Sequence, residues 1–165
     1  ADPVVGEGVG FAGVYSVYPW CGHQFNDPTV GATRIRAIVG DQDDWLSVQQ
    51  VQAQVQAIRL GGGDVTVRVV AGAAHSFDRQ EDVHEVPEAA VAPSAPTVYV
   101  DDDGSMIDPL TGRPDAGTTD LDMFLAALKA GLGRKGAHIG SVGDQPDLFR
   151  ADMLAFHASV LGPPT

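Results

Sequence analysis

The sequence is poor in cysteine and in positive charge. Its 165 residues include one cysteine, Cys21, so no disulfide can form within the chain. Lysine and arginine together number 10, against 22 aspartate and glutamate residues, which gives a formal net charge of −12. Because binding to phosphates needs clustered lysine and arginine, this balance argues against nucleic acid as a partner.

Long apolar runs are also absent. The chain has no stretch of about 18 consecutive apolar residues, so we expect no transmembrane helix and no membrane partner. Hydrophobic residues nevertheless make up 44% of the chain, close to the average for globular domains. We therefore expect one folded domain over residues 1–165.

Two runs with strand character flank one amphipathic helix. Residues 33–39 and 65–70 are rich in β-branched side chains, and residues 46–60 carry apolar side chains at helical spacing. Ser47, followed three residues later by Gln50, matches a capping box at the start of that helix. Strand, helix and strand with short joints predict a βαβ unit with parallel pairing.

The remaining segments extend this pattern. Residues 11–18 read as a short strand, and residues 118–130 and 146–161 have the apolar periodicity of helices. Residues 79–117 are rich in proline, glycine, serine and acidic residues, so we expect a long loop or insertion there, with at most a small strand near 97–100. The predicted fold class is α/β, with parallel strands and crossover helices.

An acidic residue and a histidine follow the two strands of the βαβ unit. Asp43 comes just after the first strand, and His75 comes after the second, in a turn of small residues. Asp41 and Asp44 share the first turn and are alternatives to Asp43. A histidine in this position can act as general base and acid, and a carboxylate can orient it. The order matches the last two members of a nucleophile–acid–histidine triad.

The first member of such a triad is missing from the sequence. In α/β-hydrolases the nucleophile sits in G-x-S-x-G, or in the same motif with cysteine. No serine of the chain has a glycine two residues before it, and Cys21 has Pro19 at that position. We therefore expect the nucleophile to lie outside these residues.

Two other candidate sites are weaker. Cys21 and His23 suggest a nucleophile and base, but two neighbouring loop residues need not face each other, and a lone cysteine is more often a small buried side chain. A second stretch, around Gly104, faintly resembles a calcium-binding loop, although its spacing and closing residue do not match. Its members are Asp101, Asp103, Ser105 and Asp108. We expect a solvated turn there, and neither a metal nor a cofactor.

Three short stretches carry a family resemblance. They are VYPWC at 17–21, GDQDDW at 40–45 and AGAAHSFD at 71–78. In this order they resemble the dienelactone hydrolase family of the α/β-hydrolase fold. By that resemblance Asp43, at the G-x-x-D position, matches the family's acid, and His75, in the A-x-H-x-F setting, matches its histidine.

The resemblance implies hydrolysis of small carboxylic esters or lactones. Trp45 and Phe77, which lie beside the acid and the histidine in sequence, are our candidates for substrate binding. The family's nucleophile lies upstream, so the chain resembles the C-terminal half of such a protein. The N-terminal half, or a second polypeptide, is then the expected partner.

Two alternatives stay open at this point. Strands taken from the middle of a parallel sheet leave an exposed edge, which invites pairing with another chain. The chain is therefore either part of a hydrolase or a non-catalytic interaction module with a truncated hydrolase fold. A small acidic ion-binding protein that uses residues 101–108 is a third interpretation. The sequence indicates no compartment.

Overall fold

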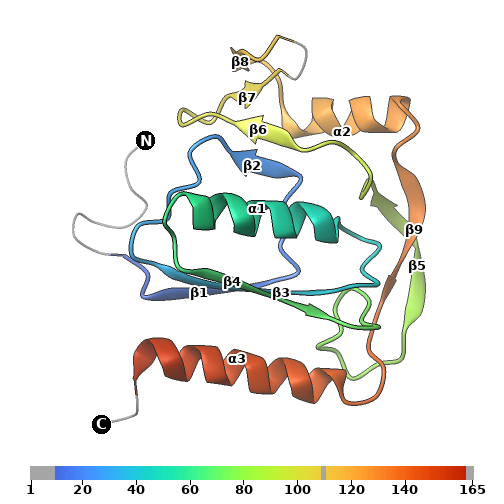
Figure 1. Cartoon of the computed structure of the whole chain (residues 1–165). Coiled ribbons are helices and arrows are strands. Elements are labelled where there is room, and N and C mark those ends of the chain that lie inside the picture. Colours follow the sequence, from blue (N-terminus) through green and yellow to red (C-terminus); the bar gives the residue numbers. More distant parts are fainter. Residues whose placement is uncertain (1–9, 109–110, 163–165) are drawn as a thin grey trace.

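The computed structural model describes residues 10–108 and 111–162. It is a mixed α/β structure in which a parallel sheet lies between helix α1 (Val48–Leu60) and helix α3 (Gln145–Leu161) (Figure 1). A second small sheet and helix α2 (Asp120–Lys129) lie beyond α1, and a two-stranded ribbon runs along one end of these layers. Among the described residues, no helix is both long enough and apolar enough to cross a membrane.

The parallel sheet confirms the predicted βαβ unit. Its strands are β1 (Gly13–Val17), β3 (Arg34–Gly40) and β4 (Val65–Val70), in the order β1-β3-β4, and both pairings are parallel. Helix α1 crosses from β3 to β4 on one face of the sheet. All three carboxyl ends therefore lie at the same edge of the sheet, which is where the residues of the site are found.

Alternation along β3 explains why the sheet has a helix on each face. Ala37 and Val39 pack in a cluster with Val51 and Val55 of α1, whereas Ile38 packs in a second cluster with Phe149 of α3. Fully burying an aliphatic side chain of this kind stabilises a fold by about 2 kcal/mol. The two faces of β3 thus hold both helices against the sheet.

Helix α1 begins where the capping pattern predicts. The Oγ of Ser47 accepts a hydrogen bond from the backbone N–H of Gln50 at 3.3 Å. The helix ends at Gly61, whose N–H donates to the carbonyl of Ala57 at 3.0 Å. Because β3 ends at Gly40 and α1 starts at Val48, the loop that holds Asp43 spans residues 41–47.

Charged side chains also hold helix α3 to the sheet. The carboxylate of Asp152, 7% exposed, accepts hydrogen bonds from Arg36 at 2.6 and 3.0 Å, from Arg68 at 2.8 Å and from the Tyr15 hydroxyl at 3.0 Å. Burial opposes ionisation of Asp152, but these hydrogen bonds outweigh it and lower its pKa to about 2. One residue of α3 thereby contacts all three strands.

Residues 79–117, where we expected a long loop or insertion, contain four strands among the described residues. Strand β5 (His84–Val91) pairs antiparallel with β9 (Arg134–Ile139), with a register shift between Val86 and Ala90. Pro87 lies inside that shift, where a residue without an N–H costs no ladder hydrogen bond. The polar composition hid the strand, since most of β5 is solvent-exposed.

The second small sheet draws on distant parts of the chain. Its strands, in spatial order, are β2 (His23–Phe25), β6 (Val98–Val100), β7 (Met106–Ile107) and β8 (Pro114–Asp115). Of these, only a small strand near β6 was expected. The two- and three-residue strands are too short to show a periodicity in sequence.

Candidate active site

His75 and Asp43 form a hydrogen-bonded pair. The Nδ1 atom of His75 lies 2.8 Å from Oδ2 of Asp43, and the carboxylate is fully buried. With an ionised carboxylate, Nδ1–H is the donor and the remaining ring nitrogen, Nε2, is the basic atom. The prediction that Asp43 contacts His75 is confirmed.

The backbone of the acid loop fixes the Asp43 carboxylate. Its Oδ1 accepts the N–H groups of Trp45 at 3.0 Å and Leu46 at 3.1 Å, which leaves Oδ2 for His75. Such local side chain to backbone bonds are typical of aspartate in turns. The acid loop itself therefore orients the carboxylate.

The two neighbouring acids have other partners. Asp41 accepts the N–H of Gly72 at 2.7 Å, which ties the acid loop to the histidine loop. Asp44 accepts the backbone N–H of His138 at 2.8 Å and contacts His138 Nδ1 at 2.9 Å and Arg134 at 3.1 Å. Burial raises the pKa of Asp44, but these bonds outweigh it and hold the pKa below its usual value. Neither acid competes for His75.

Two aromatic rings hold the imidazole in place. Trp45 stacks on His75 with ring centroids 5.2 Å apart at 24°, and Tyr18 lies 4.9 Å away at 50°. The His75 side chain is 19% exposed. Within residues 10–108 and 111–162, Nε2 has no hydrogen-bond partner. The ring is thus fixed while its basic nitrogen stays available.

Tyr18 also joins the end of β1 to the histidine loop. Its hydroxyl donates to the Asp78 carboxylate at 2.9 Å and accepts the Asp78 N–H at 3.1 Å. Burial raises the pKa of Tyr18, and the hydrogen bond to Asp78 adds to the effect. Tyr18 stays protonated at neutral pH and acts as a positioning residue. Its sequence signals were its place at a third strand end and its position in the VYPWC stretch.

Gly40 lets the acid loop and the histidine loop approach closely. A Cβ atom at Gly40 would collide with the backbone carbonyl of Ala73. That carbonyl accepts the N–H of Gln42 at 3.0 Å. The absence of a side chain at Gly40 therefore sets the spacing between the loops that carry Asp43 and His75.

The two predicted substrate-binding residues have different places. Trp45 stacks on His75 and also lines an apolar cavity. Phe77 is 0% exposed and packs with Ile38 and Val70 in the core. A side chain without exposed surface cannot touch a bound molecule, so Phe77 belongs to the core and its predicted role was wrong.

The alternative Cys21–His23 pair does not form. Cys21 is 8% exposed, belongs to the core, and its pKa is raised to about 11 by burial. His23 instead lies 3.5 Å from the Asp120 carboxylate, with the Trp20 ring against its edge. A protonated, buried thiol is a poor nucleophile.

The described residues also give no support to a metal site. In the part of the chain that the structure describes, no group of three or more histidine, cysteine, aspartate or glutamate side chains could hold a metal ion. The stretch around Gly104 is a turn between β6 and β7, in which Ser105 donates its N–H to Asp103 at 2.8 Å.

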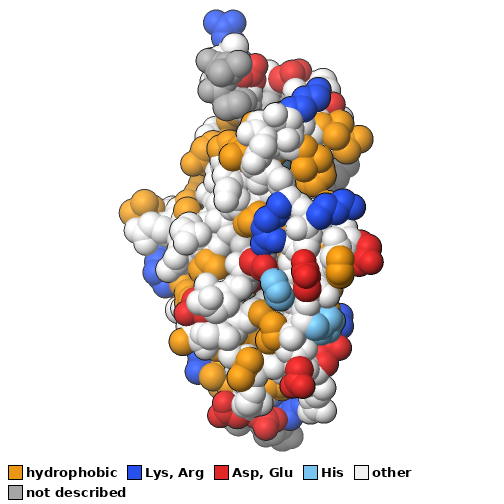
Figure 2. Space-filling view, turned by 90° about the vertical axis from the view of Figure 1, so that its right-hand side faces the viewer, with side chains coloured by type: hydrophobic (Ala, Val, Ile, Leu, Met, Phe, Trp, Pro, Cys, Tyr) orange, Lys and Arg blue, Asp and Glu red, His pale blue; other side chains and the backbone are white. Residues whose placement is uncertain are grey.

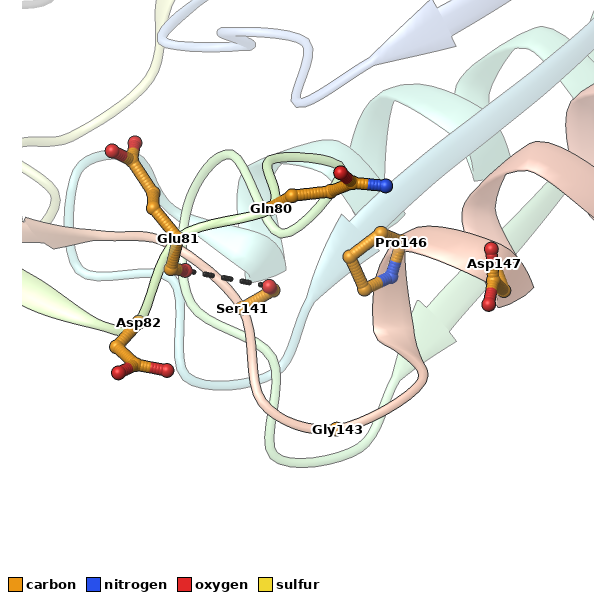
Figure 3. Close-up of a pocket in the computed structure, with 7 residues that line it drawn as sticks. All are labelled: Gln80, Glu81, Asp82, Ser141, Gly143, Pro146 and Asp147. Atoms are coloured by element: carbon orange, nitrogen blue, oxygen red, sulfur yellow. Dashed lines mark hydrogen bonds between the residues drawn. The ribbon is translucent and has the colours of Figure 1, made fainter.

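A polar pocket of about 510 Å³ lies beyond the histidine loop (Figure 3). It lies between residues 80–82 and the start of α3, and Ser141 borders it. The Ser141 hydroxyl donates to the Arg79 carbonyl at 2.6 Å, so it does not serve His75. Among the described residues, no hydroxyl or thiol is hydrogen-bonded to His75.

The β5–β9 ribbon is the part of the site that the sequence did not reveal. Arg134 and His138 of β9 hold the acid loop through Asp44, and Gly140 donates its N–H to the carbonyl of His75 at 3.0 Å. Figure 2 shows this side of the molecule, where histidine, acidic and basic side chains lie next to one another. No spacing or motif in residues 134–140 indicates that role.

Comparison of the chain with protein families, with curated proteins and with solved structures finds no match. The function must therefore be inferred from the geometry of the Asp43–His75 pair and its surroundings.

Proposed function

We propose that this chain supplies the acid and the base of a hydrolase of carboxylic esters or lactones. In this proposal it is the C-terminal part of an α/β-hydrolase domain that resembles dienelactone hydrolases. Asp43 orients the imidazole, and His75 moves the proton. The serine or cysteine nucleophile comes from residues outside the chain, on an N-terminal half or on a second polypeptide.

One observation carries the proposal. A fully buried carboxylate, held by two backbone N–H groups, contacts Nδ1 of a histidine whose Nε2 is available. Structural histidines rarely need an oriented buried acid, whereas general bases do. The two residues follow the carboxyl ends of adjacent parallel strands, where the sites of open α/β sheets are usually found.

The chemistry follows from the two ring nitrogens. Nε2 of His75 accepts the proton of the attacking hydroxyl or thiol as it bonds to the ester carbonyl carbon. The resulting imidazolium is stabilised by Asp43 and then protonates the leaving alkoxide. Water attacks the acyl-enzyme in the second half-reaction, with the same histidine as base. Trp45 and Tyr18 keep the ring from turning between these steps.

The edge of the sheet at β1, one of its two edge strands, supports a missing neighbour. Within the described residues, β1 pairs only with β3, so its other edge has unpaired backbone groups. A strand added there in parallel would end beside Tyr18 and bring a nucleophile toward His75. The same edge also favours the alternative function, a non-catalytic module that pairs with another protein.

An esterase assay separates the two functions. We expect the isolated chain to hydrolyse p-nitrophenyl acetate little faster than free imidazole, and co-expression with an N-terminal half that bears G-x-S-x-G or G-x-C-x-G to give turnover. In that complex, Asp43→Asn should lower kcat by about 10³- to 10⁴-fold, because it disturbs the tautomer of His75.

The matched control uses two histidines. His75→Ala should remove most of the activity, whereas His84→Ala should not, since the exposed His84 ring is hydrogen-bonded, among the described residues, only to the carbonyl of Asp82. A stable but inactive complex would favour the interaction module. Turnover by the isolated chain that is lost in Cys21→Ala would refute the proposal in favour of a cysteine nucleophile.

A further inference from the structure

An apolar cavity of about 540 Å³ is lined by Trp45, whose ring stacks on His75, while His75 itself is not among the lining residues. Its walls come from the inner side of α2, from Trp20 and Trp45, and from residues 90–98. A space of this size falls within the range of small-molecule binding sites.

The side chains that line the cavity are mostly apolar and come from several elements of the fold. Met123 and Phe124 of α2 point their half-buried side chains toward it, and Ala127 completes the helical face. Polar side chains are few and lie together, with His23 beside Asp120 and Gln50 bound to the carbonyl of Ala95. A mostly apolar pocket with a small polar group is the usual form of a ligand site.

The charges select the kind of ligand. Asp120 lines the cavity, and the whole chain carries a net charge of −12. Both disfavour a carboxylate or phosphate, while His23 can hydrogen-bond to an uncharged polar atom. The occupant that fits is a neutral, largely apolar molecule or chain.

We infer that this cavity binds the apolar part of a neutral ligand, and that Trp45 separates it from the imidazole of His75. If the proposed function holds, the ligand is an ester whose alkyl or aryl group lies in the cavity against Met123 and Phe124, while its carbonyl group lies on the His75 side of Trp45. That the ligand is an ester rests on the proposed function, whereas the binding of a neutral, apolar ligand does not.

Energy transfer from tryptophan provides a direct assay. The chain has two tryptophans, Trp20 and Trp45, and both line the cavity. The neutral fluorophore N-phenyl-1-naphthylamine absorbs where tryptophan emits, so its binding quenches tryptophan and raises the dye's own emission. We expect saturable binding with one site per chain. Ethyl octanoate should displace the dye more strongly than sodium octanoate does.

A filled cavity gives the decisive comparison. Ala126→Phe places a ring in the cavity from an exposed position on α2, and should weaken dye binding at least tenfold. Ala155→Phe, an exposed alanine on α3, is the matched control and should stay within twofold. Ala130→Phe, also at the lining, is a second filling variant in case the first does not fold.

The outcomes separate this inference from the proposed function. The cavity assignment is wrong if the dye does not bind, or if both filling variants bind it as well as the control does. Either result overturns the assignment even if the reconstituted enzyme is active. Binding that the filling variants abolish supports it even if no esterase activity is found. In an active complex, we expect Ala126→Phe to raise KM for octanoate esters more than for acetate esters.

Discussion

Loss of the Asp152 carboxylate should destabilise this chain in a pH-dependent way. The pKa of Asp152 is about 2 in the fold and 3.8 for an unperturbed aspartate, a difference worth about 2 kcal/mol of unfolding free energy. Because the folded pKa is the lower one, this contribution is complete above pH 3.8 and disappears as the pH falls through about 2. We expect Asp152→Asn to lower the free energy of unfolding by about 2 to 4 kcal/mol at pH 7, since it also leaves Arg36 and Arg68 uncompensated.

Urea unfolding at several pH values measures this effect. The difference between the native chain and Asp152→Asn should shrink by about 1 kcal/mol between pH 7 and pH 3. Asp147→Asn is the matched control on the same helix, because its pair with Arg150 is exposed and is worth less than about 1 kcal/mol. A difference that stays constant with pH, or a control that loses as much, would refute the role of the buried cluster.

Two further expectations concern the loops and the thiol. Gly40→Ala should lower the free energy of unfolding by about 1–3 kcal/mol, because the added Cβ overpacks against Ala73. Gly10→Ala, with open space around it, should change the urea midpoint little. Equal midpoints for both variants would show that the loops carrying Asp43 and His75 can separate freely. Cys21, with a pKa raised to about 11 by burial, should react with iodoacetamide at pH 8 at least tenfold more slowly than in urea and faster as the pH rises; a native rate equal to the unfolded one would contradict its place in the core.

The βαβ unit and the Asp43–His75 pair could be predicted because their signals are local. The β-branched runs that became β3 and β4, and the Ser47 cap between them, each depend on a few neighbouring residues. Once two parallel strands are placed side by side, their carboxyl ends bring Asp43 and His75 together without further information. Choosing Asp43 over its neighbours needed the family resemblance.

The ribbon and the cavity could not be predicted because they depend on distant pairings. His84 of β5 lies opposite Ile139 of β9, and neither segment shows a strand pattern by itself. Gly136 of β9 has a φ of 84° and lies at the register shift between β5 and β9. A glycine inside a segment lowers its strand propensity, so the sequence argues against a strand there. The sequence indicates an apolar face of α2 formed by Leu121, Phe124, Leu125 and Leu128, but the three leucines are exposed in the structure. The cavity is lined instead by Met123, Phe124 and Ala127 of this helix.

The anchoring of Asp43 by its own loop has a consequence for assembly. Since the N–H groups of Trp45 and Leu46 orient the carboxylate, the folded chain would already contain the acid and base that the proposed function requires. A nucleophile-bearing polypeptide would then need only to dock. On mixing, activity should appear at a rate proportional to the concentrations of both pieces, with no slow unimolecular phase after they meet.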